Sequence, residues 1–132
     1  MKRFLLSLFL LFSTLLPQVQ AAEELLPADK AFAFKAKVVN DKILLDWDIA
    51  KGYYLYKEKI KISADLSTQL GTAKFPKAKI KDDEFFGKVG IYRNNAQVSI
   101  PVLPGDAKSI LLTVTFQGCA DLGVCYPPMT KS

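Results

Sequence analysis

Apolar and polar residues alternate with a period of two through most of the chain, and this alternation constrains the fold more than any other feature. It is typical of β-strands that have one buried face. The alternating apolar residues of four such segments are Phe32, Phe34, Ala36 and Val38; Ile43, Leu45, Trp47 and Ile49; Ala96, Val98, Ile100 and Val102; and Ile110, Leu112, Val114 and Phe116. The turn-forming pairs Asn40-Asp41 and Pro104-Gly105 separate neighbouring segments.

The rest of the chain predicts more β-structure. A strand-like segment runs from Tyr53 to Ile62, whereas residues 63–90 are less regular and predict loops and short edge strands. No stretch predicts a long helix. Short strands at even spacing, with turns between them, favour an all-β fold, and we predict an immunoglobulin-like β-sandwich.

The N-terminus has the layout of a signal peptide. Lys2 and Arg3 precede an apolar run from Phe4 to Leu16, and a small-residue pattern ends at Ala21. The run is shorter than the roughly 20 residues of a membrane-spanning helix. We therefore predict cleavage after Ala21, export, and a single domain over residues 22–132.

Composition excludes several classes of function. The 18 basic and 13 acidic residues give a net charge of +5, which is too mild to indicate a nucleic-acid partner. The chain has no histidine, which rules out Ser-His and Cys-His nucleophile pairs and every His-containing zinc site. Two cysteines alone make a poor metal site. We expect neither a hydrolase nor a bound metal or cofactor.

The two cysteines, Cys119 and Cys125, are the strongest candidates for chemistry. An exported chain meets an oxidising compartment in which a disulfide persists. Residues 120–124 include turn-forming types, so the chain can reverse and bring the two sulfurs together at the mouth of a hairpin. A static bridge over this loop contributes about 2.4 kcal/mol in the chain-entropy model. Spacing alone leaves two alternatives open, a secreted β-sandwich binding module with a structural disulfide and a redox pair, and it favours the first.

A family resemblance changes this preference. The segment Gln117–Pro128, with the sequence QGCADLGVCYPP, resembles the cysteine segment of the N-terminal periplasmic domain of the DsbD family of bacterial thiol:disulfide interchange reductases. Further segments resemble the same domain in the same order, namely Pro27–Phe32, Gly52–Tyr56, Asp83–Lys88 and Ile91–Arg93. The similarity extends over nearly all of residues 22–132.

The resemblance implies an electron-transfer function on the periplasmic side of the inner membrane of a Gram-negative bacterium. Such a domain has an immunoglobulin-like fold and receives electrons from the C-terminal thioredoxin-like domain of its own protein. It passes them to periplasmic thioredoxin-fold proteins, including disulfide isomerases and cytochrome c maturation thioredoxins. The membrane is reached only through the rest of the full-length protein, and the redox-active disulfide needs no cofactor.

The resemblance also assigns roles to individual residues. Cys125 corresponds to the cysteine that forms the mixed disulfide with partners, and Cys119 to its resolving companion. Residues 82–87 correspond to a cap loop in which Phe85 covers the disulfide until a partner displaces it. Asp83 and Glu84 in this loop would raise the pKa of a nearby thiol through their negative charge.

The same comparison places two tyrosines near the cysteines. Tyr54 and Tyr56 match these positions, and alternation puts both on one face of a strand. Phe86, which precedes Gly87 in the cap loop, stands where many relatives have tyrosine, and Val124 stands where a bulkier aromatic residue can occur. These departures remove a hydroxyl contact at the first position and an aromatic partner contact at the second.

Overall fold

The computed structural model describes residues 24–132, so the predicted signal peptide lies outside the described residues. Within residues 24–132 the strands dominate, and the helical elements are a single four-residue turn and two short 3-10 segments. In chain order the elements are α1 (Ala28–Ala31), β1 (Phe32–Val39), β2 (Lys42–Ile49), β3 (Tyr53–Tyr56), η1 (Lys57–Lys59), β4 (Lys61–Ala64), η2 (Ser67–Gln69), β5 (Lys79–Asp83), β6 (Gly87–Tyr92), β7 (Asn95–Pro101), β8 (Leu112–Phe116), β9 (Gly118–Ala120), β10 (Val124–Cys125) and β11 (Met129–Lys131).

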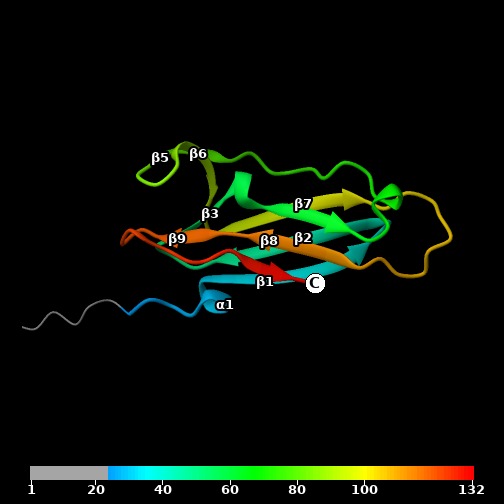
Figure 1. Ribbon diagram of the computed structural model, residues 1–132, viewed down its shortest axis with the longest axis horizontal. Coiled ribbons are helices and arrows are strands. Elements are labelled where there is room, and N and C mark those ends of the chain that lie inside the picture. The colour runs from blue at the N-terminus through cyan, green and yellow to red at the C-terminus, as the bar shows by residue number, and fades with distance from the viewer. Residues whose placement is uncertain (1–23) are drawn as a thin grey trace, which may run out of the picture.

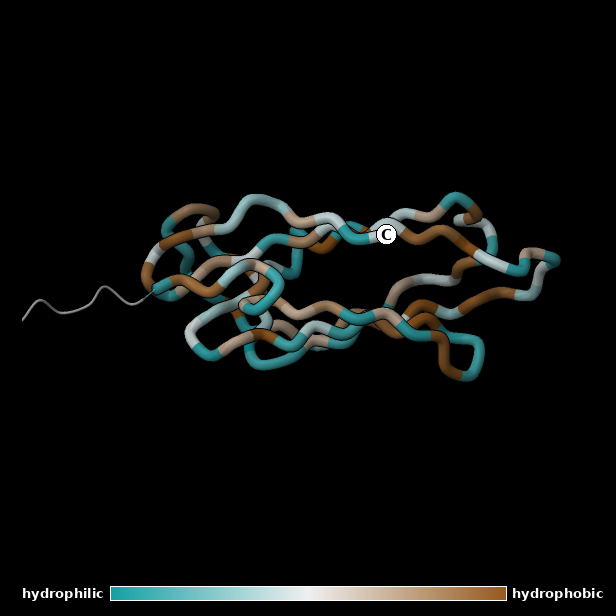
Figure 2. The backbone as a smooth tube through the Cα atoms, turned by 90° about the horizontal axis from the view of Figure 1, so that it is seen from below, coloured by the Kyte–Doolittle hydropathy of each residue, from teal (hydrophilic) through white to brown (hydrophobic). Residues whose placement is uncertain are grey.

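The strands form three antiparallel sheets arranged as a sandwich, as predicted. Their orders are β1-β2-β7, β10-β9-β3-β6-β5 and β11-β8-β4. β1, β2, β7 and β8 run along the long axis of the molecule (Figure 1), and the side view shows two layers of chain (Figure 2). The short connections from β3 to β4 and from β8 to β9 lead from the five-stranded sheet directly into the sheet that holds β4 and β8.

Aromatic residues fill the space between the layers. Trp47 of β2 packs edge-on against Phe116 of β8, with ring centroids 5.5 Å apart. Phe34 of β1 lies 5.7 Å from the same phenylalanine ring. The main core is one cluster of apolar side chains in contact. It includes Ala31, Leu45, Val98 and Ile100, and Met129 packs against it. Contact between β2 and β8 therefore joins the two layers.

Two strand predictions differ from the structure in detail. The segment Tyr53–Ile62 is not one strand, because η1 interrupts it and sends Tyr56 and Ile60 into different apolar clusters. The alternation of β1 predicts that Val38 faces the core, but Val38 is 72% exposed. β1 is the edge strand of its sheet, and burial along it ceases beyond Phe34.

The irregular middle of the chain contains more sheet than the sequence indicates. β5 is an edge strand, as expected, but β6 lies inside its sheet between β3 and β5. Full burial along β6 begins only at Gly90. The exposed residues Gly87 and Lys88 at its start therefore do not show the alternation of apolar and polar residues that would predict a strand. The β5–β6 hairpin lies above β3 at the end of the molecule that also carries β9 (Figure 1). The part of the chain that the structure describes has no helix long and apolar enough to cross a membrane.

Candidate functional site

The two cysteines are bonded to each other across the hairpin formed by β9 and β10. Cys119 and Cys125 occupy directly opposed positions, with Cα atoms 4.0 Å apart. The Tyr126 backbone N–H donates to the Gly118 carbonyl next to them, at 3.0 Å. The cysteines thus form the pair of an antiparallel ladder whose side chains approach most closely. The Cys119 side chain is fully buried and Cys125 is half-buried, so Cys125 is the more accessible sulfur.

Strand β3 brings the two predicted tyrosines to the sulfurs. Tyr54 lies directly opposite Cys119 in the ladder between β3 and β9. The Tyr56 hydroxyl oxygen lies 3.1 Å from Cys119 Sγ and 3.8 Å from Cys125 Sγ. The bonded sulfurs carry no hydrogen, so these distances are contacts between oxygen and sulfur. The structure therefore brings Tyr54 and Tyr56 to the same face, as alternation predicts.

The Asp83 carboxylate anchors both tyrosines from the end of β5. Its Oδ2 atom accepts hydrogen bonds from the Tyr54 and Tyr56 hydroxyls, each at 2.9 Å. Its Oδ1 atom accepts from the backbone N–H groups of Phe85 and Phe86, at 2.9 and 3.0 Å. Asp83 is the one buried charged side chain among residues 24–132, and all four bonds go to acceptor positions of a carboxylate.

These contacts fix the protonation states. Burial alone would raise the pKa of Asp83, but the hydrogen bonds from Phe85, the two tyrosines and Phe86 outweigh it, and the pKa lies below its usual value. Burial, followed by the interactions with Asp83, raises the pKa of Tyr54. Burial, Tyr54 and Asp83 raise the pKa of Tyr56 still further. At neutral pH Tyr56 therefore stays protonated and Asp83 ionised, so the Tyr56 hydroxyl donates its hydrogen bond to Asp83 and presents a lone pair to the sulfurs.

The predicted cap loop is the tight connection between β5 and β6. Asp83 pairs with Gly87, whose positive φ of 73° closes the three-residue loop, as is typical of such hairpins. The ring that contacts the site is Phe86, which lies edge-on to Tyr56 with centroids 5.0 Å apart. Phe85, to which the family resemblance assigns the cap, is 51% exposed, and its role stays a prediction. A Cβ placed on Gly123 would lie 3.2 Å from a Glu84 oxygen, so Glu84 stands over the cysteine hairpin.

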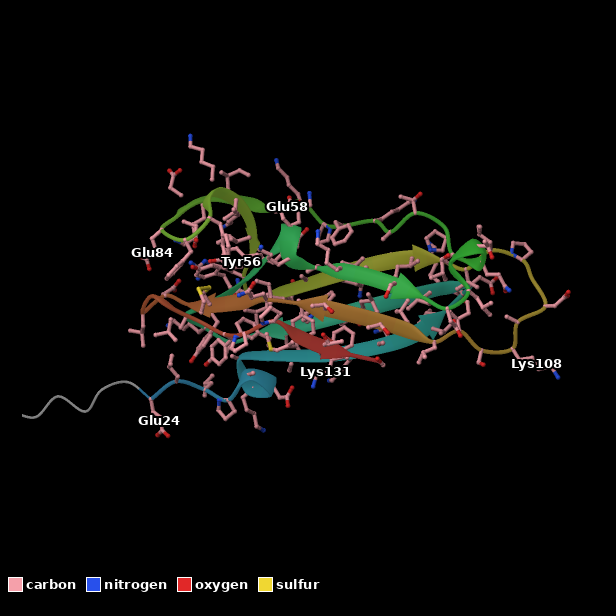
Figure 3. The ribbon with its side chains drawn as sticks, in the orientation of Figure 1. Glu24, Tyr56, Glu58, Glu84, Lys108 and Lys131 are labelled. Carbon is pink, nitrogen blue, oxygen red and sulfur yellow. A yellow bond between two sulfur atoms is a disulfide. The ribbon has the colours of Figure 1, made fainter. Side chains whose placement is uncertain are left out.

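Figure 3 shows Tyr56 and Glu84 at the same end of the molecule, with Tyr56 on the inner side. Tyr56 belongs to a small apolar cluster with Tyr54, Ile91 and Cys119, against which Val89 and Cys125 pack. The main core contains none of these residues. The site is therefore a separate unit beside the core. In the described part of the chain, no group of three or more His, Cys, Asp or Glu side chains is placed to hold a metal.

The structure adds three residues that the sequence left without a role. The Arg93 guanidinium donates two hydrogen bonds to the Asp121 carboxylate, at 2.9 and 3.1 Å, and a third to the Tyr53 carbonyl, at 3.3 Å. Gly118 has no room for a side chain, because a Cβ there would lie 2.5 Å from the Phe32 ring. Arg93, Asp121 and Gly118 all lie within the segments that resemble the DsbD family. That resemblance is the sequence signal that could have identified them.

Comparisons with known proteins agree with this geometry. The family model described as "Thiol:disulfide interchange protein DsbD, N-terminal" matches residues 22–132. The thiol:disulfide interchange protein DsbD of Neisseria meningitidis serogroup A is 40% identical over 127 residues, covering 95% of this chain and 21% of the relative. The DsbD protein of Escherichia coli K12 is 41% identical over 110 residues, covering 83% of this chain and 19% of the relative. The chain thus spans about a fifth of these relatives.

Two solved structures have a similar fold. The reduced DsbD N-terminal domain of Neisseria meningitidis has a TM-score of 0.74 and 42% identity, covering 80% of this chain and 85% of that one. The second is the complex between the DsbD N-terminal and PilB N-terminal domains of Neisseria meningitidis. It has a TM-score of 0.73 and 39% identity, covering 83% of this chain and 86% of that one. The predicted immunoglobulin-like fold is confirmed.

Proposed function

The chain belongs to the family of DsbD N-terminal domains, and from this premise we propose that it is a thiol-disulfide oxidoreductase domain that reduces disulfides of partner proteins. The observation that carries the proposal is the position of the disulfide. It closes a hairpin at one end of the sandwich, outside the main core, with one sulfur buried and the other half-buried. A bond placed there can open while the core stays packed.

The two sulfurs divide the reaction between them. In the reduced domain, the Cys125 thiolate attacks one sulfur of a partner disulfide, and the other partner sulfur leaves as a thiolate that takes up a proton. Cys119 then loses its proton and attacks Cys125 Sγ in the mixed disulfide, which releases the second partner thiol. The domain ends oxidised, and the partner gains two electrons and two protons.

The environment of the pair supports this division. Cys125 lies on β10, the edge strand of its sheet, where a partner can approach, whereas Cys119 lies between β10 and β3. In the reduced state the Cys119 thiol can donate to the Tyr56 oxygen, because the Tyr56 O–H group is already engaged as a donor to the Asp83 carboxylate. The nearby Asp83 charge also disfavours a thiolate until a partner changes the surroundings. No group other than the two sulfurs needs to carry the electrons.

We infer the partners from the family and from the greater length of its members, of which this chain spans about a fifth. We infer that a C-terminal thioredoxin-like domain of the same full-length protein supplies the electrons. The recipients are periplasmic thioredoxin-fold proteins such as disulfide isomerases and cytochrome c maturation thioredoxins, and the domain acts at the periplasmic face of the inner membrane after export. The solved complex of a relative with the PilB N-terminal domain supports a protein as the partner.

Trapping the mixed disulfide tests the assignment. The Cys119→Ser domain is expected to accumulate a covalent adduct with a disulfide-bonded thioredoxin-fold protein, because the domain has lost its own resolving thiol and the adduct can decay only by the return of the partner thiolate. The Cys125→Ser domain is expected to form none. Non-reducing electrophoresis with mass spectrometry separates the outcomes, and adducts on Cys119 alone would reverse the assignment.

The alternative, a binding module with a structural disulfide, predicts a different redox equilibrium. Structural disulfides typically have reduction potentials below about −300 mV, and exchangeable ones lie higher. Equilibration with a thioredoxin-fold protein of known potential measures the Cys119–Cys125 couple. A pair that stays oxidised in the presence of a reduced thioredoxin-fold protein would overturn the proposed function.

A further inference from the structure

Arg93 joins the cysteine hairpin to the strand that carries the tyrosines. It follows β6, and its guanidinium binds Asp121 in the turn between β9 and β10 through two hydrogen bonds of 2.9 and 3.1 Å. The same group donates to the Tyr53 carbonyl of β3 and lies 5.2 Å from the centre of the Tyr54 ring. A planar guanidinium that donates two hydrogen bonds to one carboxylate fixes the relative orientation of the two side chains as well as their distance.

Opening of the disulfide removes the only covalent connection across this hairpin. β10 has two residues and pairs with β9 alone, so without the disulfide only noncovalent contacts hold Cys125 opposite Cys119. On the Asp121 side, the remaining contacts are a backbone bond from Asp121 N–H to the Gly52 carbonyl, at 2.8 Å, and the bond from Gly123 N–H to Ala120. On the Cys125 side, Tyr126 N–H donates to the Gly118 carbonyl at 3.0 Å, and the Gln117 side-chain amide donates to the Tyr126 carbonyl at 3.1 Å. The Arg93–Asp121 pair is the side-chain contact that ties the turn to the sheet.

We propose that Arg93 is a positioning residue that keeps the two thiols of the reduced domain close together and so makes the domain a stronger reductant. The inference rests on the proposed exchange chemistry. In the oxidised domain the disulfide holds the hairpin closed whether or not the ion pair is present. In the reduced domain only the weak contacts remain, so loss of the pair lets the hairpin open.

The consequence is a change in redox equilibrium. In exchange with glutathione, the dithiol and one glutathione disulfide give the intramolecular disulfide and two molecules of glutathione. If loss of the ion pair increases the conformational freedom of the reduced form alone, the reduced form becomes more stable relative to the oxidised form. An exposed ion pair of this kind corresponds to about a two- to fivefold change in that equilibrium, which is about 9 to 21 mV for a two-electron couple.

Four single variants and one double variant of the domain test the proposal. Arg93→Gln removes the charge and the fork, Asp121→Asn removes the acceptor charge, and Arg93→Lys keeps the charge but loses the fork. Lys131→Gln is the matched control, since it breaks the ion pair with Asp29, whose N–O distance is 2.7 Å, away from the site. The measurement is the glutathione equilibrium constant of each domain at neutral pH, with hydrogen exchange of the Gly123 and Tyr126 amides in both redox states.

We expect Arg93→Gln, Arg93→Lys and Asp121→Asn to lower the equilibrium constant for disulfide formation two- to fivefold. The Arg93→Gln/Asp121→Asn double variant should match the single variants, and Lys131→Gln should equal the unchanged domain. Faster amide exchange should appear only in the reduced state. Equal constants in all variants would overturn the proposal, as would an effect in Arg93→Gln that Arg93→Lys fully restores, because charge alone would then explain it.

Failure of this proposal can be distinguished from failure of the proposed function. Glutathione is a small reagent, so a contact between Arg93 and a partner protein cannot contribute. If the unchanged domain fails to exchange with glutathione or thioredoxin-fold proteins, the proposed function fails. If it exchanges and the variants behave alike, only the role of Arg93 fails.

Discussion

Replacement of Asp83 by asparagine tests the polarity of the hydrogen bonds around the sulfurs. Asparagine keeps the shape of the side chain but has one acceptor oxygen and one donor amide in place of two acceptor oxygens. If the oxygen stays with the Phe85 and Phe86 N–H groups, the amide faces the tyrosines and donates to their hydroxyl oxygens. The Tyr56 hydroxyl is then free to donate toward the sulfurs, which reverses its direction in the unchanged domain.

The size of the effect follows from the four bonds to Asp83. Hydrogen bonds to a charged group contribute about 1.5–3 kcal/mol each, and neutral ones about 0.5–1.5 kcal/mol. Four bonds weakened by about 1 kcal/mol each would cost about 4 kcal/mol, but an amide is less costly to bury than a carboxylate. We expect a net loss of about 2 kcal/mol in the free energy of unfolding at pH 7, or roughly 8 °C in melting temperature for a domain of this size.

The pH dependence identifies the ionised form as the source of this stability. The pKa of Asp83 lies below the unfolded-state value of about 3.9, so the folded state binds its proton more weakly than the unfolded state. The stabilisation is complete above about pH 5 and is lost as the pH falls through the folded-state pKa. The difference between the two domains should therefore be constant from about pH 5 to 7 and shrink below about pH 4.

Urea unfolding of the oxidised domains between pH 2 and 7 measures this difference. Asp29→Asn is the control, because its carboxylate is 77% exposed and a surface ion pair contributes less than about 1 kcal/mol. After reduction, iodoacetamide should alkylate the Asp83→Asn domain about fivefold faster at pH 7, since a donated hydrogen bond of about 1 kcal/mol stabilises a thiolate. Equal stability at pH 7, or a difference that persists in acid, would refute the reasoning.

Three further changes test other contacts of the site. Phe86→Ala removes the ring that packs on Tyr56 and should speed alkylation of the reduced pair severalfold; if Phe85→Ala does so instead, Phe85 is the cap, as the family resemblance implies. Gly118→Ala should lower the free energy of unfolding, measured in urea, by more than about 3 kcal/mol, because the new Cβ would clash with the Phe32 ring and the Tyr54 backbone. Gly105→Ala is the control and should lower it by less than about 1 kcal/mol, because its Cβ would contact the movable Gln69 side chain. Burial and the neighbouring Tyr53 raise the pKa of Tyr126 to about 12, so stability should fall as the pH rises from about 10 through 12, and Tyr126→Phe should remove that part of the loss.

The period of two was enough to predict the strands that face the main core. β2 and β7 lie in the middle and at the edge of their sheet with one face against the opposite layer, and their burial alternates along most of their length. The prediction fails where tertiary contacts change along a strand. The face of β1 is covered only near Phe34, and β6 is covered only from Gly90 onward, so local alternation does not report the burial of Val38 or the presence of β6.

The site shows the same division between local and tertiary information. The spacing of Cys119 and Cys125 predicts a hairpin, and alternation predicts that Tyr54 and Tyr56 share a face. The meeting of both hydroxyls on one oxygen of Asp83 depends on where β5 ends relative to β3, and β6 lies between these two strands. No pattern within either segment encodes that offset, so the resemblance to the DsbD family alone placed residue 83 near the sulfurs.

The division of the apolar residues into two clusters explains how a disulfide can be protected from solvent and still open and close by thiol–disulfide exchange. The sandwich is held by the cluster around Trp47 and Phe116, to which neither Cys119 nor Cys125 belongs. A short loop closed by this disulfide adds only about 2.4 kcal/mol in the chain-entropy model, so the folded state need not depend on the bond. Burial of Cys119 protects the pair from water, while Cys125 on the edge strand stays within reach of a partner. Redox chemistry at the hairpin can therefore proceed while the core stays closed.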